Sequence, residues 1–253
     1  MPNPRPDISI VVPVMNEAEN VSALADEIST AMNATKYAWE CVWVDDGSTD
    51  ATWDELTALV ARDDHHRALA HDRNYGQSAA LSVGFRAARG RVFAMLDGDG
   101  QNDPADVPRL MARLEQGDVD MVNGVRATRR DSFVRRACSR IANRVRSMVL
   151  HDGVTDVGCS MRVFKRECVD NVPVFRGLHR FLPGLAAMRG YRITETSVNH
   201  RPRTRGVTKY GIGNRLWVGL ADMYGVLWVK RRFVYPHVRE CLPAEPESGQ
   251  SRT

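Results

Sequence analysis

The sequence predicts an α/β fold: a mostly parallel, Rossmann-like central sheet with helices on both faces. Three observations carry this prediction. The chain of 253 residues is 43% hydrophobic, enough for one substantial domain that needs no crosslinks. Short β-branched runs alternate with segments in which apolar residues recur every three or four positions. The connections between these segments are short, as they are in doubly wound sheets.

The first elements follow this alternation closely. The run ISIVVPV (8–14) predicts a buried strand, and apolar residues at helical spacing follow from Glu17. WECVWV (39–44) predicts the next strand. Side chains at 48–50 then favour the start of a helix that runs to about Arg62, because Ser, Thr and Asp accept hydrogen bonds from the first backbone N–H groups of a helix.

The same order continues to about residue 125. A brief strand is expected at 67–70, a helix in SAALSVGFRAA (78–88) and a strand in RVFAML (91–96). Pro104 favours the start of the next helix, with Asp103 just before it, and DMVNGV (120–125) predicts a further strand. Further on, residues 133–150 are expected to be helical and YRITETSV (191–198) to be a strand.

Charge divides the chain into two unlike halves. Residues 1–120 carry 10 Lys and Arg against 21 Asp and Glu, a net charge of −11. Residues 121–253 carry 25 against 10, a net charge of +15, and the two halves give the total of +4. An acidic half suited to a cation is therefore joined to a basic half suited to anions. The five dispersed cysteines are typical of reduced thiols in the cytosol, and MPNPRPD has no apolar core of a secretion signal.

Three polar stretches directly follow predicted strands. They are PVMNE (13–17), DDGSTD (45–50) and DGDGQ (97–101). Because parallel strands end at one edge of a sheet, where such folds bind ligands, we expect these stretches to lie together.

The stretch DGDGQ favours a divalent cation. A helix–loop–helix calcium site is excluded, because its sixth position holds Asn102 and its twelfth holds Pro108. The chain also lacks G-x-G-x-x-G after the first strand and a P-loop, so nucleotide phosphates need another partner. Asp97 and Asp99 are expected to point the same way along an extended segment, with room for a ligand at Gly98. Their hard oxygen atoms suit Mg²⁺ or Mn²⁺.

Together with RNYGQ (73–77), these stretches resemble, in order and spacing, the family 2 glycosyltransferases with the GT-A fold. The second half is similar to the polyprenyl-phosphate branch, typified by dolichol-phosphate mannose synthase. The matching stretches are GVRATRR (124–130), RRACSR (135–140), DVGCSMRVFKR (156–166), HRFLP (179–183) and HRPRTRGVTKYG (200–211). The resemblance covers about residues 8–232.

The resemblance implies roles for individual residues. The nucleoside pocket of a GDP- or UDP-linked sugar donor would be lined by Pro13, Met15, Glu17, Asp45 and Asp46. The metal on the donor diphosphate would be held by Asp97, Asp99 and Gln101, with Gly98 beside it. The acceptor phosphate would be taken by Arg126, Arg135 and Ser139, while Arg203 and Lys209 close over the phosphates. Two departures from the family are Met15, commonly an aromatic residue, and Gly100, frequently a larger apolar one.

This assignment implies a metal-dependent, inverting transfer of a sugar to a polyprenyl phosphate. A phosphate monoester is already largely ionised near neutral pH, since its second pKa is about 6. It therefore needs positioning and charge screening rather than a base, and arginines suit that task. Asp99 is the candidate base if one is needed. Three alternatives stay open: a hydroxyl acceptor on a glycan or lipid, a non-catalytic nucleotide-sugar-binding scaffold at a membrane, and a basic face that binds nucleic acid. The scarcity of aromatic residues among the arginines of 126–146 argues against the last of these.

We expect the chain to divide into a catalytic domain (1–211), an amphipathic helix that suits a membrane interface (212–235) and a polar, disordered tail (236–253). The apolar stretch LWVGLADMYGVLWV (216–229) would span roughly 21 Å as a helix, against a bilayer core of about 30 Å. Trp217, Tyr224 and Trp228 share a helical face, which fits an interfacial helix, although a buried helix fits as well.

We therefore expect a cytoplasmic protein bound peripherally to the cytoplasmic membrane face, through this helix, through a membrane-protein partner or as a homo-oligomer. The sequence leaves open the sugar, the nucleotide, the polyprenol and the oligomeric state.

Overall fold

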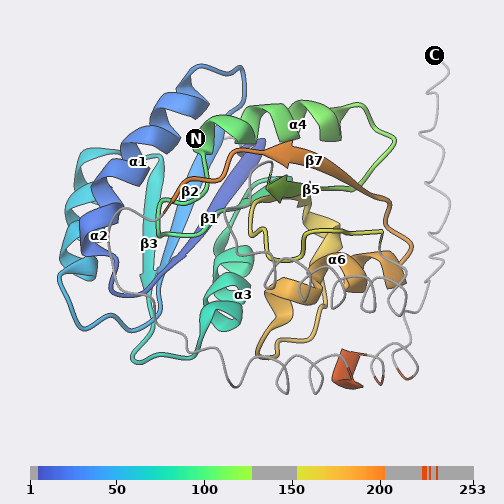
Figure 1. Ribbon diagram of the computed structural model, residues 1–253. Coiled ribbons are helices and arrows are strands. Elements are labelled where there is room, and N and C mark those ends of the chain that lie inside the picture. The colour runs from blue at the N-terminus through green and yellow to red at the C-terminus, as the bar shows by residue number, and fades with distance from the viewer. Residues whose placement is uncertain (1–4, 127–152, 203–223, 227, 229–231, 233–253) are drawn as a thin grey trace, which may run out of the picture.

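The computed structural model describes residues 5–126, 153–202, 224–226, 228 and 232, and Figure 1 shows how its elements are arranged. The strands are β1 (Ile8–Val14), β2 (Trp39–Asp45), β3 (His66–Ala70), β4 (Val92–Met95), β5 (Met121–Arg126), β6 (Arg162–Lys165) and β7 (Ile193–Val198). The α-helices are α1 (Ala18–Asn33), α2 (Thr52–Arg62), α3 (Gln77–Ala87), α4 (Val107–Glu115) and α6 (Leu178–Met188). Short 3₁₀ helices form η1 (Pro104–Asp106) and η2 (Arg166–Cys168).

In the described part of the chain, seven strands form one sheet in the order β3-β2-β1-β4-β6-β5-β7. The pairs β1–β2, β1–β4, β2–β3 and β5–β7 are parallel. Strand β6 runs antiparallel to both of its neighbours, β4 and β5. The prediction of a mostly parallel sheet is confirmed, whereas β6 and helix α6 were not predicted.

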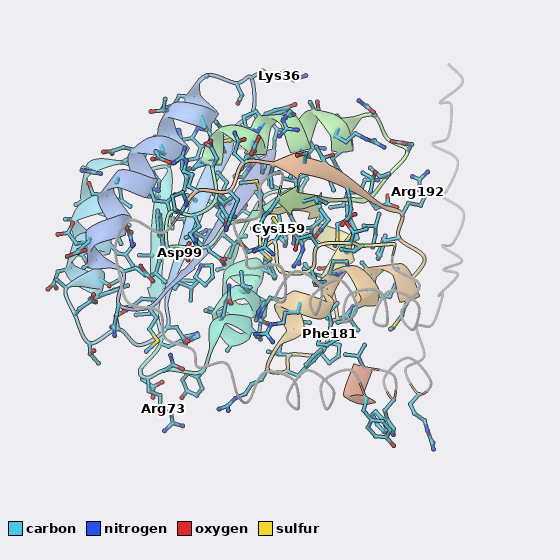
Figure 2. The ribbon with its side chains drawn as sticks, viewed as in Figure 1. Lys36, Arg73, Asp99, Cys159, Phe181 and Arg192 are labelled. Carbon is cyan, nitrogen blue, oxygen red and sulfur yellow. The ribbon has the colours of Figure 1, made fainter. Side chains whose placement is uncertain are left out.

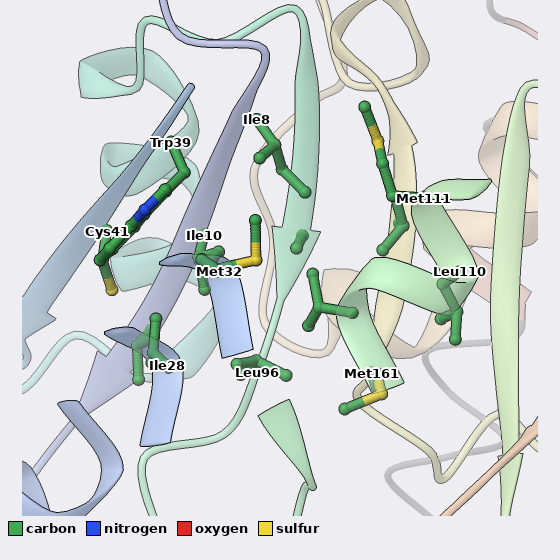
Figure 3. Close-up of a cluster of buried hydrophobic side chains, with 14 of the residues drawn as sticks. Ile8, Ile10, Ile28, Met32, Trp39, Cys41, Leu96, Leu110, Met111 and Met161 are labelled. Carbon is green, nitrogen blue, oxygen red and sulfur yellow. The ribbon is translucent and has the colours of Figure 1, made fainter. Parts of the chain in front are cut away.

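Both faces of the sheet are buried under helices, as β1 illustrates. Its residues Ile8 and Ile10 belong to a hydrophobic cluster with α1, α2 and α4, while Val11 belongs to a second cluster with α3 and α6. Figure 3 shows part of the first cluster, with Ile10 of β1 and Ile28 of α1 among its labelled residues. Burial on both faces explains why the strand sequences read as nearly continuous apolar runs instead of alternating with polar residues.

The acidic stretch after β4 differs from its prediction. Strand β4 ends at Met95, and the backbone turns at residues 98–99 rather than running on in extended form. Gly100 has φ 71°, a left-handed conformation that glycine adopts at little cost. The expectation that Asp97 and Asp99 lie on one extended segment is therefore wrong, because the backbone turns between them.

The start of α2 is also more specific than predicted. Asp50 lies one residue before the N-cap, Ala51, and its Oδ1 accepts hydrogen bonds from the backbone N–H of Thr52 at 3.0 Å and from the Thr52 hydroxyl. Ser48 and Thr49 instead bond to Asp45 and to Asn16. Asp103 accepts a hydrogen bond from the backbone N–H of Ala105 and so begins η1, as predicted.

Several predictions lie outside the described residues: the helix at 133–150, most of the segment 212–235, the tail 236–253, and the side chains of Arg135, Ser139, Arg203, Lys209 and Trp217. Among the described helices, none combines the length and hydrophobicity that crossing a bilayer requires. Cys41, Cys159 and Cys168 are buried free thiols.

Candidate functional site

The loops that follow β1, β2 and β4 meet at one edge of the sheet, as predicted. The backbone N–H of Asn16, after β1, donates to the Ser48 hydroxyl after β2 at 2.8 Å. The Asn16 side chain accepts in turn from the backbone N–H of Thr49, also at 2.8 Å. Asn16 has φ 51°, a conformation that asparagine tolerates better than most residues. The first two loops are therefore locked together by reciprocal hydrogen bonds.

The third loop packs directly on the end of β1 through Gly98. A Cβ at this position would lie 2.5 Å from Cγ1 of Val14 and 3.0 Å from the carbonyl oxygen of Pro13. The glycine therefore allows β4 to turn closely over β1. This corrects the interpretation that Gly98 leaves room for a ligand, because the space beside it is filled by β1.

Asp97 is held by residues from several elements. Its Oδ1 accepts a 2.7 Å hydrogen bond from Nε2 of Gln77, the first residue of α3. Its backbone N–H donates to Oδ1 of Asn102 at 2.8 Å, and the Ser160 hydroxyl donates to that same oxygen at 2.9 Å. Burial raises the pKa of Asp97 to about 6, and the charge of Asp99 adds to the rise.

The remaining two predicted metal ligands lie on the same turn. Oδ1 of Asp99 accepts from the backbone N–H of Gln101 at 3.1 Å, and Figure 2 labels Asp99 on this turn. The backbone N–H of Arg201 donates to the Gln101 carbonyl at 2.9 Å, and Nε2 of Gln101 donates to the Arg201 carbonyl at 3.3 Å. With Nε2 engaged in this way, Oε1 is the side-chain atom of Gln101 that can bind a cation.

The chemistry of this turn fits Mg²⁺ or Mn²⁺. Two carboxylates and an amide oxygen are the hard donors that these ions prefer. Burial and the neighbouring carboxylate of Asp99 both disfavour the ionised form of Asp97. A divalent cation between Asp97 and Asp99 would stabilise that form.

The residues expected to line a nucleoside pocket surround the first two loops. Asp45 and Asp46 are buried at the end of β2, and Oδ1 of Asp45 accepts from the backbone N–H of Ser48 at 3.0 Å. Glu17 accepts a 2.6 Å hydrogen bond from the side-chain amide of Asn20, within the start of α1. Met15 contacts the Asn74 side chain through its sulfur, and Pro13 lies in β1. All five predicted residues therefore belong to one end of the sheet.

On the basic side, the structure describes one of the predicted phosphate-binding residues, Arg126. Its guanidinium lies at the end of β5 and donates two hydrogen bonds, both 2.8 Å, to the carboxylate of Asp156. Gly158 packs closely against this guanidinium, because a Cβ there would lie 2.6 Å from Nη2 of Arg126. Arg126 is thus already oriented by the protein.

Three residues without a predicted role, Gln77, Asp156 and Arg162, are also connected to the site. Arg162 is 1% exposed, and it donates to Oδ1 of Asn123 at 2.5 Å and to the Cys159 carbonyl at 3.0 Å. Gln77 stood within RNYGQ and the other two within DVGCSMRVFKR. These residues therefore lie within stretches that resemble the family, but the contacts of the three side chains depend on the fold and cannot be read from the sequence.

The comparisons with known proteins agree with this geometry. The model of the family described as "Glycosyl transferase family 2" matches residues 9–172. The chain belongs to glycosyl transferase family 2. This glycosyltransferase is 36% identical over 229 residues to dodecaprenyl-phosphate galacturonate synthase of Rhizobium johnstonii, covering 89% of this chain and 68% of that protein. It is 37% identical over 206 residues to undecaprenyl-phosphate 4-deoxy-4-formamido-L-arabinose transferase of Yersinia pestis, covering 81% of this chain and 63% of that protein.

Solved structures confirm the GT-A fold of the glycosyltransferase. Glucosyl-3-phosphoglycerate synthase from Mycobacterium tuberculosis, in complex with Mn²⁺ and UDP-glucose, superposes with a TM-score of 0.64 at 20% identity, covering 90% of this chain and 79% of the other. A mannosyltransferase from Pyrobaculum calidifontis, in complex with GDP-mannose and Mn²⁺, gives a TM-score of 0.64 at 21% identity, with coverage of 93% and 67%.

Proposed function

We propose that this glycosyltransferase moves a sugar from a nucleotide-sugar donor to a polyprenyl phosphate, with inversion and with Mg²⁺ or Mn²⁺. The observation that carries the proposal is the turn of Asp97, Asp99 and Gln101, which lies beside the loops after β1 and β2. The names of the two relatives, which act on dodecaprenyl and undecaprenyl phosphate, support the acceptor class.

The donor binds across the edge of the sheet in this proposal. Asp97, Asp99 and Gln101 hold the cation, which when bound stabilises the negative charge of the departing nucleoside diphosphate. The nucleoside occupies the space near Met15 and Asp45, at the ends of β1 and β2. GDP- and UDP-linked sugars both suit this arrangement.

The acceptor phosphate approaches from the basic half of the chain. Arg126 is described at this side, and Arg135 and Ser139 join it according to the family resemblance, with Arg203 and Lys209 over the phosphates. Arginine forks onto phosphate oxygens, so these side chains orient the ionised acceptor for in-line attack on the anomeric carbon. Asp99 serves as the base only if the acceptor arrives protonated.

We further infer peripheral binding to the cytoplasmic membrane face through the helix near residue 226. Val226 is 1% exposed and packs in the cluster with α3 and α6, whereas Tyr224 and Trp228 are 75% and 58% exposed. A helix held to the core by one face and presenting aromatic residues on another fits the interface of a bilayer. Basic Lys230, Arg231 and Arg232 follow in the sequence and suit anionic headgroups.

Two variants of the catalytic domain test the reaction. Asp99→Ala should abolish product from dodecaprenyl phosphate and a panel of GDP- and UDP-sugars while leaving the thermal unfolding transition intact. Undiminished turnover would rule out the proposed metal site. Arg135→Ala separates the acceptor classes, because it should cripple transfer to a phosphate and affect transfer to a hydroxyl much less.

Vesicle flotation tests the membrane surface. The double variant Tyr224→Ala/Trp228→Ala should lose most binding to vesicles that contain anionic lipid, whereas Trp53→Ala, which removes a 40% exposed tryptophan from α2, should bind like the wild type. Equal flotation of all three proteins would contradict this attachment.

A further inference from the structure

The carboxylate of Asp46 is fully engaged inside the protein. Its Oδ1 accepts hydrogen bonds from Nδ1 of His71 at 2.8 Å and from the backbone N–H of Tyr75 at 2.9 Å. Its Oδ2 accepts from the backbone N–H of Gly76 at 2.8 Å, and its side chain is 5% exposed. These contacts differ from the nucleoside-lining role that the family resemblance implies for Asp46, because both oxygens point into the segment 71–76.

This segment is also packed against the turn that follows Asp46. A Cβ on Gly47 would lie 2.4 Å from the backbone carbonyl carbon of Arg73 and 2.7 Å from the backbone nitrogen of Asn74. The turn and the segment therefore touch backbone to backbone. The hydrogen bonds that Asp46 accepts from His71, Tyr75 and Gly76 also orient the segment, so the path of residues 71–76 is determined at the end of β2.

The segment 71–76 leads directly into the metal-binding turn. Gly76, at φ 94°, is the last residue before α3, and Gln77 is the first residue of that helix. Nε2 of Gln77 donates to Oδ1 of Asp97 at 2.7 Å. This hydrogen bond fixes one oxygen of the Asp97 carboxylate and so sets the rotation of the group.

We propose that Asp46 and Gln77 are positioning residues for the metal-binding carboxylate, acting in series. Asp46 places the segment 71–76, this segment places Gln77, and Gln77 sets the rotation of the Asp97 carboxylate. The inference rests on the proposed function, since it assumes that Asp97 binds the donor's cation. It assigns Asp46 to the diphosphate end of the donor site rather than to the nucleoside.

Groups that orient a metal ligand without touching the metal commonly change metal affinity by 10-fold to 100-fold. A residue that contacts the nucleoside instead changes nucleotide affinity whether or not the metal is present. A positioning role therefore lowers the enhancement of nucleotide binding by Mn²⁺, whereas a nucleoside contact leaves this enhancement unchanged. One measurement distinguishes the two roles. That measurement is the ratio of the dissociation constants of a nucleoside diphosphate without and with Mn²⁺.

The experiment titrates GDP and UDP into the full chain by calorimetry, each with and without Mn²⁺, and follows the nucleotide that the wild type binds. Asp46→Asn places an amide N–H₂ or a reoriented oxygen against the Gly76 N–H and should lower the Mn²⁺ enhancement about 10-fold, with the metal-free affinity unchanged. Gln77→Ala should give the same loss. The double variant should be no worse than the more impaired single variant, because the two residues act in series.

Asp72→Asn is the matched control, because Asp72 is an exposed carboxylate of the same segment. It should keep the wild-type enhancement. If Asp46→Asn does not fold, Gln77→Ala alone tests the role of the Gln77 amide. Asp46→Glu, which keeps the charge and displaces the oxygens, then takes the place of Asp46→Asn.

The outcomes separate this inference from the proposed function. A wild type without any Mn²⁺ enhancement would overturn both. A normal wild type beside variants that keep the full enhancement would overturn the positioning role alone. If Asp46→Asn loses nucleotide affinity equally with and without Mn²⁺, Asp46 contacts the nucleoside as the family resemblance implies. That result would also overturn the positioning role.

Discussion

The guanidinium of Arg126 and the carboxylate of Asp156 form a two-bonded ion pair, with Nε–Oδ2 and Nη2–Oδ1 both at 2.8 Å. The Arg126 side chain is 17% exposed and that of Asp156 is 5% exposed. Glu195 supports the pair from β7, since its Oε1 accepts from the backbone N–H of Thr155 at 2.8 Å. The protein thus holds the guanidinium of Arg126 in a defined orientation at the end of β5.

Asp156→Asn is expected to weaken acceptor binding and to destabilise the fold. The amide keeps the shape of the side chain but removes the charge that balances a mostly buried guanidinium. Breaking such a pair costs about 3 kcal/mol of unfolding free energy. We expect the KM for dodecaprenyl phosphate to rise about 10-fold, equivalent to about 1.4 kcal/mol, and the KM for the donor to change little. Steady-state kinetics and urea unfolding measure the two effects.

The surface pair of Arg113 and Asp118 provides the control. Its side chains are 26% and 61% exposed, so Asp118→Asn should leave the free energy of unfolding nearly unchanged and both KM values unchanged. An unchanged acceptor KM in folded Asp156→Asn would mean that Arg126 does not bind the acceptor phosphate.

Cation binding is expected to weaken as the pH falls through about 6. Burial and the neighbouring Asp99 raise the pKa of Asp97 to about 6, so below this pH the side chain is increasingly protonated and cannot bind a cation. The Mn²⁺ enhancement of nucleotide binding should be constant above about pH 7 and decline by up to about 10-fold per pH unit well below 6. Calorimetric titrations across this range measure the enhancement, and metal-free binding is the control. An enhancement that stays constant to about pH 5 would contradict the assignment.

The sequence predicts the first half of the fold well because its elements are determined locally. Strand β1 (Ile8–Val14) coincides with the run ISIVVPV, in which every residue is buried. The juxtaposition of the polar loops also follows from local information, because parallel strands end at the same edge. These regularities need no knowledge of distant contacts.

The elements that the sequence did not reveal depend on tertiary contacts. Strand β6 has the sequence RVFK, with charged residues at both ends, and it exists because β4 and β5 pair with it on either side. Helix α6 contains Pro183 and Gly184, which disfavour a helix locally. Its buried face of Phe181, Leu182 and Leu185 against the sheet outweighs that preference.

The same reason explains which site residues could be found. Asp97, Asp99 and Gln101 are adjacent in sequence and form a recognisable pattern. The bonds of Asp46 to His71 and of Gln77 to Asp97 join residues 25 and 20 positions apart. No periodicity reports such pairs, so the engagement of Asp46 became visible only in the structure.

Acid is expected to destabilise the protein through His66. Its side chain is fully buried, and Nδ1 accepts from Nε1 of Trp43 at 3.0 Å, which requires the neutral imidazole. Burial lowers the pKa of His66 to about 4 from its ordinary 6.5. The unfolded chain therefore binds the proton more tightly, and stability present above pH 6.5 is lost as the pH falls to about 4, by up to about 3 kcal/mol.

Urea unfolding between these two pH values measures the loss. His66→Asn keeps an acceptor for Trp43 without titrating, so its stability should fall less steeply with decreasing pH. Part of the slope should remain, because burial also lowers the pKa of His179 to about 3. His65→Asn, which changes a half-exposed neighbour, should keep the wild-type slope, and an unchanged slope in His66→Asn would refute the assignment.

Glu40 is expected to matter for stability but not for catalysis. Its buried carboxylate accepts from the Ser9 hydroxyl at 2.7 Å, from the backbone N–H of Arg89 at 2.6 Å and from Nη1 of Arg67 at 3.1 Å. These contacts lie toward the amino ends of β1 and β2, away from the donor site. Removing an acceptor that satisfies several buried donors should make Glu40→Ala about 3–5 kcal/mol less stable and Glu40→Gln about 1–3 kcal/mol less stable.

Guanidinium unfolding and turnover of the same preparations separate the two properties. Glu115→Gln is the control, because Glu115 is a carboxylate that also accepts a hydrogen bond, from Tyr37, but is 43% exposed and should cost less than about 1 kcal/mol. At a temperature where all the proteins are folded, kcat should be equal in the wild type, Glu40→Gln and Glu115→Gln. A folded Glu40→Gln with reduced kcat would show that the amino ends of the strands influence the metal-binding turn.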